Sequence, residues 1–94
     1  MRWFTYILHC ADGAFYVGHC HDIDERERRH NAGDGARFTA KRRPVRVAYF
    51  EEFATEQESI DRELQWKRWS RAKKEALIAG NKALLHALAK RRKP

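Results

Sequence analysis

Two short stretches rich in β-branched and aromatic residues, separated by a turn, constrain the fold of this chain more than any other feature. The first is Thr5-Tyr6-Ile7-Leu8 and the second is Tyr16-Val17-Gly18. Between them stands Ala11-Asp12-Gly13, where the glycine can adopt the positive φ that a tight reversal requires. The sequence therefore predicts a β-hairpin near the N-terminus.

The length of that turn decides whether the two tyrosines share a face of the hairpin. Side chains alternate between the faces of a strand, so a one-residue change in register moves every side chain to the other face. A three-residue turn with Gly13 in the left-handed conformation pairs Leu8 with Tyr16. Tyr6 and Tyr16 then lie on one face, whereas a two-residue turn, the commoner connection, would separate them. We predict the three-residue turn.

A charged helix is predicted directly after the hairpin. Asp22 can cap its N-terminus, and Gly33 suits its C-terminal end. Ile23, Arg26 and His30 recur at helical spacing, so they share one face of this helix. Because Ile23 is apolar, that face is expected to turn toward the sheet.

The second half of the chain predicts one more strand and three more helices. The strand, residues 45–50, is β-branched and aromatic. Capping residues then begin helices at Thr55, Ser70 and Asn81, the first running to about residue 69, the second ending at Gly80, and the last with its leucines turned inward. The order β-β-α-β-α-α-α predicts an α+β fold, a small three-stranded mixed or antiparallel sheet flanked by helices.

Composition narrows the class of protein. A chain of 94 residues has room for one domain, and 43% hydrophobic residues favour a folded protein over a disordered one. No apolar stretch approaches the ~20 residues of a membrane span, and no signal peptide is visible at the N-terminus. We therefore expect a cytoplasmic protein, with Cys10 and Cys20 reduced.

The formal net charge of +7 indicates a polyanionic partner. Acidic residues gather between positions 51 and 63, whereas basic residues gather between 37 and 46 and again at 90–93. Basic side chains of this density can grip phosphates, and an aromatic ring among them can stack on an unpaired base. The residues expected to contact nucleic acid are Arg37, Phe38, Lys41, Arg42 and Arg43. The alternative is that Phe38 packs under its own loop and the arginines are simply solvated.

The stretch His19-Cys20-His21 raises the question of a structural zinc site. Neighbouring residues of an extended segment point to alternate faces, so the thiol cannot easily join both imidazoles around one ion. Ordinary solvated histidines beside a small buried thiol are the favoured interpretation.

The hairpin motifs Thr5-Tyr6-Ile7 and Tyr16-Val17-Gly18, followed by Arg26 and His30 on the next helix, resemble the GIY-YIG nuclease domain. Glu63 suits the acidic residue of that family. The resemblance covers roughly residues 2 to 80, and it departs from the family pattern at Thr5, where the name motif has glycine, and at residues 19–21.

Three further segments resemble the small stand-alone bacterial members of the family: Asn31-Ala32-Gly33, the basic loop at 39–44, and residues 66–74. On this basis we assign residues 1–80 to a GIY-YIG-like domain and residues 81–94 to a C-terminal helix and basic tail.

The resemblance implies an endonuclease that hydrolyses nucleic-acid phosphodiester bonds with the help of a metal ion. The expected substrate is DNA of branched or single-stranded character, with RNA as an alternative. In this interpretation Tyr6 is the general base, helped by His30, and Tyr16 positions the water or the phosphate, while the reverse assignment of the tyrosines stays open.

The resemblance also implies a phosphate clamp and a cation. Arg26 would bind the scissile phosphate, and Glu63 would hold one Mg²⁺ or Mn²⁺. His19 would take the place of the lysine that some relatives carry. Without the resemblance, a simple ion pair between Glu63 and Lys67, four residues on, would explain the acid.

Two other classes of function compete with the enzyme. A protein of this charge could bind nucleic acid on the same fold without cleaving it. The acidic segment at 51–63 could instead serve as a docking surface for another protein.

Overall fold

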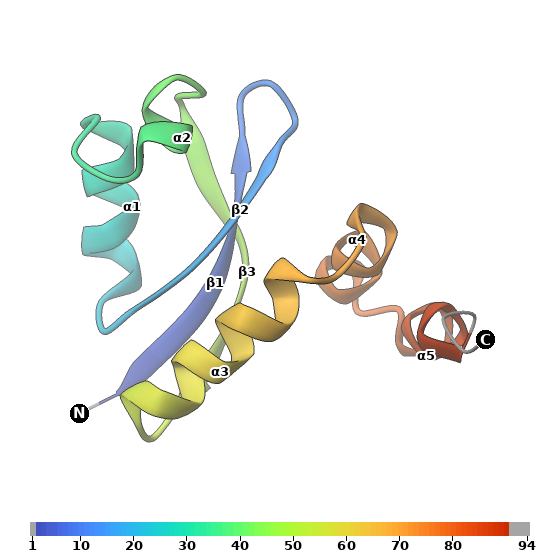
Figure 1. Cartoon of the computed structure of the whole chain (residues 1–94). Helices are drawn as coiled ribbons and strands as arrows, with labels where there is room; N and C mark the ends of the chain where they lie inside the picture. Colours follow the sequence, from blue (N-terminus) through green and yellow to red (C-terminus); the bar gives the residue numbers. More distant parts are fainter. Residues whose placement is uncertain (1, 91–94) are drawn as a thin grey trace.

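The computed structural model of the chain describes residues 2–90, apart from the side chain of Lys90. Three antiparallel strands form its sheet, β1 (Trp3–Cys10), β2 (Phe15–Cys20) and β3 (Val45–Phe53). The sheet order is β2-β1-β3, so the apolar β1 lies in the centre and β2 is an edge strand (Figure 1). The predicted α+β fold is confirmed, and the sheet is antiparallel throughout.

The hairpin has the predicted three-residue turn. The amide of Cys10 donates to the carbonyl of Ala14, and Gly13 has a φ of 90°. Leu8 therefore lies opposite Tyr16, with the side chains of Tyr6 and Tyr16 on the same face of the sheet.

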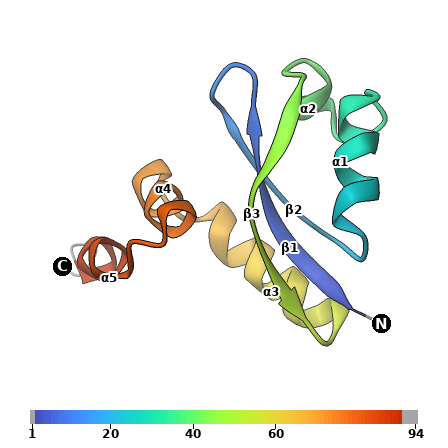
Figure 2. The ribbon, with the colours of Figure 1, turned by 180° about the vertical axis from the view of Figure 1, so that it is seen from behind.

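Helices cover both faces of the sheet (Figures 1 and 2). One face packs against α1 (Ile23–Asn31) and α2 (Arg37–Ala40), and its core contains Tyr6 and Leu8. The other face packs against α3 (Glu56–Lys67) and α4 (Arg71–Ala79), with Trp66 fully buried at its centre. The last helix, α5 (Lys82–Lys90), lies beside α4, away from the sheet. Even-numbered and odd-numbered residues of β1 thus face different cores.

Four of the helices begin where their capping residues predict. Asp22 accepts from the amide of Glu25, and Thr55 with Glu58 forms a complete capping box. Ser70 caps α4, which ends at Gly80 in the left-handed conformation, and the Asn81 side chain accepts from the amide of Leu84. The boundaries between helices are therefore set by local side-chain chemistry.

Four details differ from the sequence-based expectation. The basic loop contains the short helix α2, and β3 extends to Phe53 because it pairs with β1 as far as Trp3. Helix α3 ends at Lys67, about two residues early, because Ser70 must be extended in order to cap α4. Leu84 was expected to face inward but is 44% exposed, because α5 packs through neighbouring Leu85.

Among the described residues, no helix is both long and apolar enough to cross a membrane. The predicted basic tail beyond Lys90 lies outside the described residues. Cys10 and Cys20 are buried free thiols, and Cys20 faces the core under α1 whereas His19 faces α3.

Candidate active site

Tyr6 and His30 meet in the core between the sheet and α1. The Tyr6 hydroxyl lies 3.1 Å from Nε2 of His30, and both residues are only 2% exposed. The other ring nitrogen of His30, Nδ1, lies 2.7 Å from the hydroxyl of Thr39 in α2. Residues of β1, α1 and α2 therefore form one continuous chain of hydrogen bonds, from Tyr6 through His30 to Thr39.

The environment favours the neutral forms of both groups. Burial lowers the pKa of His30 below its usual 6.5, and the positive charges of Arg26 and Arg29 lower it further. Burial raises the pKa of Tyr6 strongly, and the nearby Arg26 offsets this only in part. At neutral pH the pair consists of a phenol and an imidazole, so Tyr6 can act as a base only after another group has taken its proton.

Two glycines allow this close approach. A Cβ atom at position 18, opposite Tyr6 in the hairpin, would lie 2.5 Å from the Tyr6 hydroxyl oxygen. A Cβ atom at position 35 would overlap the imidazole of His30. Gly18 belongs to the hairpin motif, but Gly35 was missed in the sequence because nothing there links it to a histidine five residues earlier.

A small cleft of about 250 Å³ opens beside the Tyr6–His30 pair. Its lining consists of Tyr16, Arg26, Arg29, His30, Asp34, Gly35 and Ala36. The Nε of Arg26 is buried and has no hydrogen-bond partner among residues 2–90, which leaves a donor available for an anionic ligand. Tyr16, Arg26 and His30 thus come together as predicted.

Arg29 and Asp34 also line this cleft, although the sequence analysis did not select them. Arg29 follows Arg26 by three residues, a spacing that places both on one side of a helix and could have identified it. Asp34 lies in the loop after α1, where no periodicity applies.

Glu63 and His19 lie together on the other face of the sheet. The Glu63 carboxylate is 2.5 Å from Nδ1 of His19 and 2.7 Å from Nζ of Lys67, and its side chain is 13% exposed. His19 pairs with Thr5 across the hairpin, so it points away from the face that carries Tyr6. The edge strand β2 separates this pair from the cleft, with Gly18 next to His19.

The carboxylate of Glu63 suits a hard divalent cation. Residues 2–90 hold no group of three or more histidine, cysteine, aspartate or glutamate side chains arranged for a metal. Glu63 is the predicted metal ligand, and Mg²⁺ is usually held by one or two carboxylates together with substrate phosphates and water.

The basic residues of the predicted nucleic-acid-binding loop fall into two groups. The guanidinium of Arg42 pairs with Asp12 at 3.0 Å, and Arg43 donates to the carbonyls of Ala40 and Asn31. These two arginines fasten the loop to the hairpin turn and to α1. Arg37 and Lys41 are exposed, and their side chains make no ion pair or hydrogen bond within residues 2–90.

Phe38 lies between the loop and the cleft. Its ring stacks with that of Tyr16 at a centroid distance of 6.1 Å, and the guanidinium of Arg42 lies 3.8 Å from its centroid. Phe38 is 39% exposed, so it both packs on its own loop and presents part of its ring to solvent.

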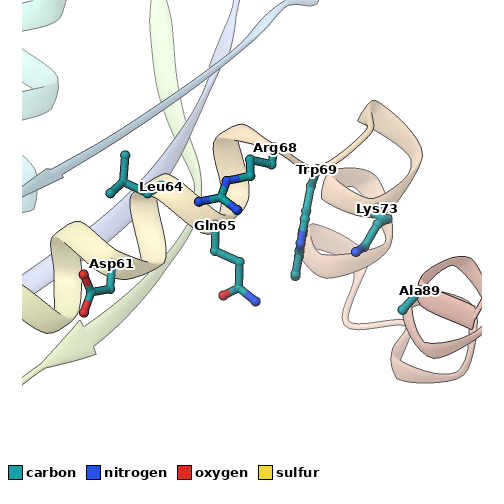
Figure 3. Close-up of a pocket in the computed structure, with 7 residues that line it drawn as sticks. All are labelled: Asp61, Leu64, Gln65, Arg68, Trp69, Lys73 and Ala89. Carbon is teal, nitrogen blue, oxygen red and sulfur yellow. The ribbon is translucent and has the colours of Figure 1, made fainter. Parts of the chain in front are cut away.

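A larger hollow lies elsewhere, in a groove of about 560 Å³ between α3, α4 and α5 (Figure 3). Its lining includes Trp69, Arg68 and Lys73, and none of the predicted site residues. The cleft beside the Tyr6–His30 pair is smaller, but its lining includes the predicted site residues Tyr16, Arg26 and His30.

A hairpin with two tyrosines on one face, followed by a helix that carries an arginine and a histidine, defines the GIY-YIG class of domain. The chain belongs to this family, because residues 2–76 match the GIY-YIG catalytic domain.

The relatives of the chain are small UPF0213 proteins, a name that states no activity. The Bacillus pumilus protein is 44% identical over 75 residues, which cover 80% of this chain and 76% of the relative. The Halobacterium salinarum protein is 44% identical over 74 residues, covering 79% and 96%.

Two solved structures share the fold of this chain. The solution NMR structure of a UPF0213 protein from Bacillus halodurans has a TM-score of 0.56 at 37% identity, over 86% of each chain. A solution NMR structure from E. faecalis has a TM-score of 0.59 at 36% identity, over 85% of each chain.

Proposed function

We propose that this protein is a metal-dependent endonuclease that hydrolyses phosphodiester bonds, with branched or partly single-stranded DNA as its substrate. Membership of a nuclease family supports the reaction class. The observation that carries the proposal is the contact between Tyr6 and a neutral His30 beside a cleft that offers an unpaired Arg26 donor.

The chemistry follows from the protonation states in the cleft. His30 takes the proton of Tyr6, and the resulting phenolate accepts a proton from the attacking water. Tyr16 is partly exposed beside them and positions the water or the phosphate. The raised pKa of Tyr6 makes its phenolate strongly basic once it forms, which suits the deprotonation of water.

Positively charged side chains in the cleft would bind the phosphate group. Arg26 binds the scissile group, and Arg29, at the mouth of the same cleft, adds a second cation. A Mg²⁺ or Mn²⁺ ion at Glu63 would neutralise charge on the phosphate oxygens.

The net charge of +7 and the unpaired side chains of Arg37 and Lys41 support a nucleic-acid substrate. The same features would also serve RNA. Duplex, single-stranded and branched DNA should therefore be tested beside RNA of the same sequences.

The decisive experiment compares wild-type protein with Arg26→Ala in the presence of Mg²⁺ or Mn²⁺. We expect cleavage by the wild type and a loss of about 10²-fold in Arg26→Ala, the usual scale for one electrostatic stabiliser. Arg28→Ala is the matched control, because Arg28 is exposed on the same helix and does not line the cleft.

Two results would contradict the proposal. Wild-type protein that binds these nucleic acids but cuts none of them would favour a nucleic-acid-binding protein without catalysis. Equal cleavage by wild type and Arg26→Ala would mean that the activity does not come from this cleft.

A further inference from the structure

We propose that Thr39 is a positioning residue, which fixes His30 in the tautomer that accepts a proton from Tyr6. The catalytic consequence rests on the proposed nuclease function, but the tautomer itself can be measured without it. Thr39 was not among the residues selected in the sequence, where it is only one position of a basic loop.

The direction of each hydrogen bond follows from counting protons. The Thr39 hydroxyl lies 3.0 Å from the carbonyl oxygen of Ala36, which can only accept, so the hydroxyl donates its single proton there. The same hydroxyl oxygen lies 2.7 Å from Nδ1 of His30. With the hydroxyl proton directed to that carbonyl, Nδ1 carries a hydrogen and donates it to Thr39.

This arrangement leaves Nε2 of His30 without a proton and 3.1 Å from the Tyr6 hydroxyl. A neutral imidazole has one donor and one acceptor nitrogen, so Tyr6 donates to Nε2. The hydrogen bonds then run in one direction, from Tyr6 to His30, to Thr39, and to the carbonyl of Ala36. When the proton moves, the Tyr6 O–H bond breaks and an Nε2–H bond forms, while Nδ1–H stays bonded to Thr39.

The opposite tautomer would leave a buried hydroxyl proton without an acceptor. Nε2 would then donate to the Tyr6 hydroxyl, whose own proton would have no other acceptor among residues 2–90, whereas the Ala36 carbonyl would keep the amide of Ala40 as a donor. Thr39 is 0% exposed and His30 is 2% exposed, so bulk water does not compete for these groups. The site therefore favours the tautomer with hydrogen on Nδ1 before any substrate binds.

The local fold explains how the loop delivers this hydroxyl. Thr39 and Ala36 are three residues apart around the single turn of α2, the spacing at which a threonine hydroxyl reaches a preceding carbonyl. Gly35, directly before that turn, lets the backbone pass against the imidazole of His30. Helix α2 thus acts as a support for His30 in addition to carrying basic side chains.

The test combines two substitutions with two measurements. Thr39→Val removes the hydroxyl at nearly constant shape, and Thr39→Ser keeps it. Nitrogen-15 NMR of the His30 ring above pH 7 should show hydrogen on Nδ1 in the wild type and in Thr39→Ser. In Thr39→Val the Nε2–H form should become populated.

For cleavage, we expect Thr39→Val to lower the single-turnover rate at saturating DNA at least ~10-fold without a matching change in affinity, and Thr39→Ser to restore it. A wild-type protein with hydrogen on Nε2 would overturn the proposal, whether or not the protein cleaves DNA and even if the valine variant does not fold. An unchanged tautomer in folded Thr39→Val, or a serine variant as slow as the valine variant, would also overturn it and leave Thr39 a packing residue.

Discussion

Glu63 and His19 form a close pair across the interface between α3 and β2, with 2.5 Å between the carboxylate and Nδ1. Tyr6 and His30 form the corresponding pair on the other face of the sheet. Tyr6 lies opposite Gly18, which directly precedes His19 in the edge strand β2, so the two pairs are neighbours along the hairpin on opposite faces of the sheet.

This placement predicts a metal requirement that depends on Glu63. Glu63→Gln keeps the shape of the side chain and removes its charge, so cleavage with Mg²⁺ or Mn²⁺ should fall about 10²-fold. The rate should be measured over a metal titration, with a chelator as the zero point. Glu56→Gln is the matched control, because Glu56 lies farther from His19, at 3.7 Å, and is more exposed. Undiminished cleavage in Glu63→Gln, or cleavage in the chelator, would refute this role.

Local chemistry made much of the fold predictable. The hairpin register followed from Gly13 and side-chain parity, and the helix starts followed from residues such as Asp22 and Ser70. The remaining features of the fold depend on tertiary contacts, which the sequence does not reveal. Nothing in the sequence showed that Arg42 would be held by Asp12, because that contact requires the hairpin turn and the basic loop to meet in space.

The candidate site was predictable to the same extent. Strand periodicity could place Tyr6 with Tyr16 on one face of the hairpin, and helix periodicity could place Arg26 with His30 on one face of the helix. The position of Thr39 could not be predicted, because its contact with His30 depends on the path of a loop in which the sequence shows no periodicity. The face occupied by Glu63 was equally hidden, since periodicity does not say which side of the sheet α3 covers.

Nucleic-acid binding should depend on Arg37 and Lys41 more than on the other basic residues of the loop. These two side chains are free for phosphates, whereas Arg42 and Arg43 already bond within the protein. If each contacts one phosphate of duplex DNA, the double alanine variant should lower the slope of log affinity against log salt by about 2. Lys82→Ala, an exposed change on α5, is the control. An unchanged slope in the double variant would remove these residues from the interface.

The acidic segment at 51–63 is expected to contribute to stability through Glu51. Arg62 donates to both carboxylate oxygens of Glu51, and the Tyr49 hydroxyl donates to one of them. Burial alone would raise the pKa of Glu51, but these hydrogen bonds and the charge of Arg62 outweigh it and lower the pKa below 4.5. Burial and the adjacent carboxylate also raise the pKa of Tyr49 to about 12.

Because the folded pKa of Glu51 lies below the unfolded one, the unfolded chain binds the proton more readily. The stabilisation from Glu51 is therefore complete above about pH 4.5 and is lost as the pH falls through the folded pKa. Glu51→Gln should lower the free energy of unfolding at pH 7 and have a smaller effect near pH 3. Urea unfolding of both proteins at the two pH values tests this, and an equal difference at both would contradict it.

The pH dependence of cleavage should reflect His30. His30 must be neutral to take the proton of Tyr6, and its lowered pKa means that the acid limb of the rate profile falls below pH 6.5. The groups that face it or share its cleft are Tyr6, Tyr16, Arg26, Arg29 and Asp34.

Removing a positive charge near His30 should raise its pKa. Arg29→Ala should therefore move the acid limb to higher pH, because Arg29 is one of the charges that lowers the pKa of His30. Arg28→Ala should leave the limb in place, since Arg28 is exposed on the same helix and does not line the cleft. Single-turnover rates at saturating DNA and constant ionic strength separate this shift from weaker substrate binding. A limb that moves equally in both variants would show that general charge, and not the His30 environment, sets the profile.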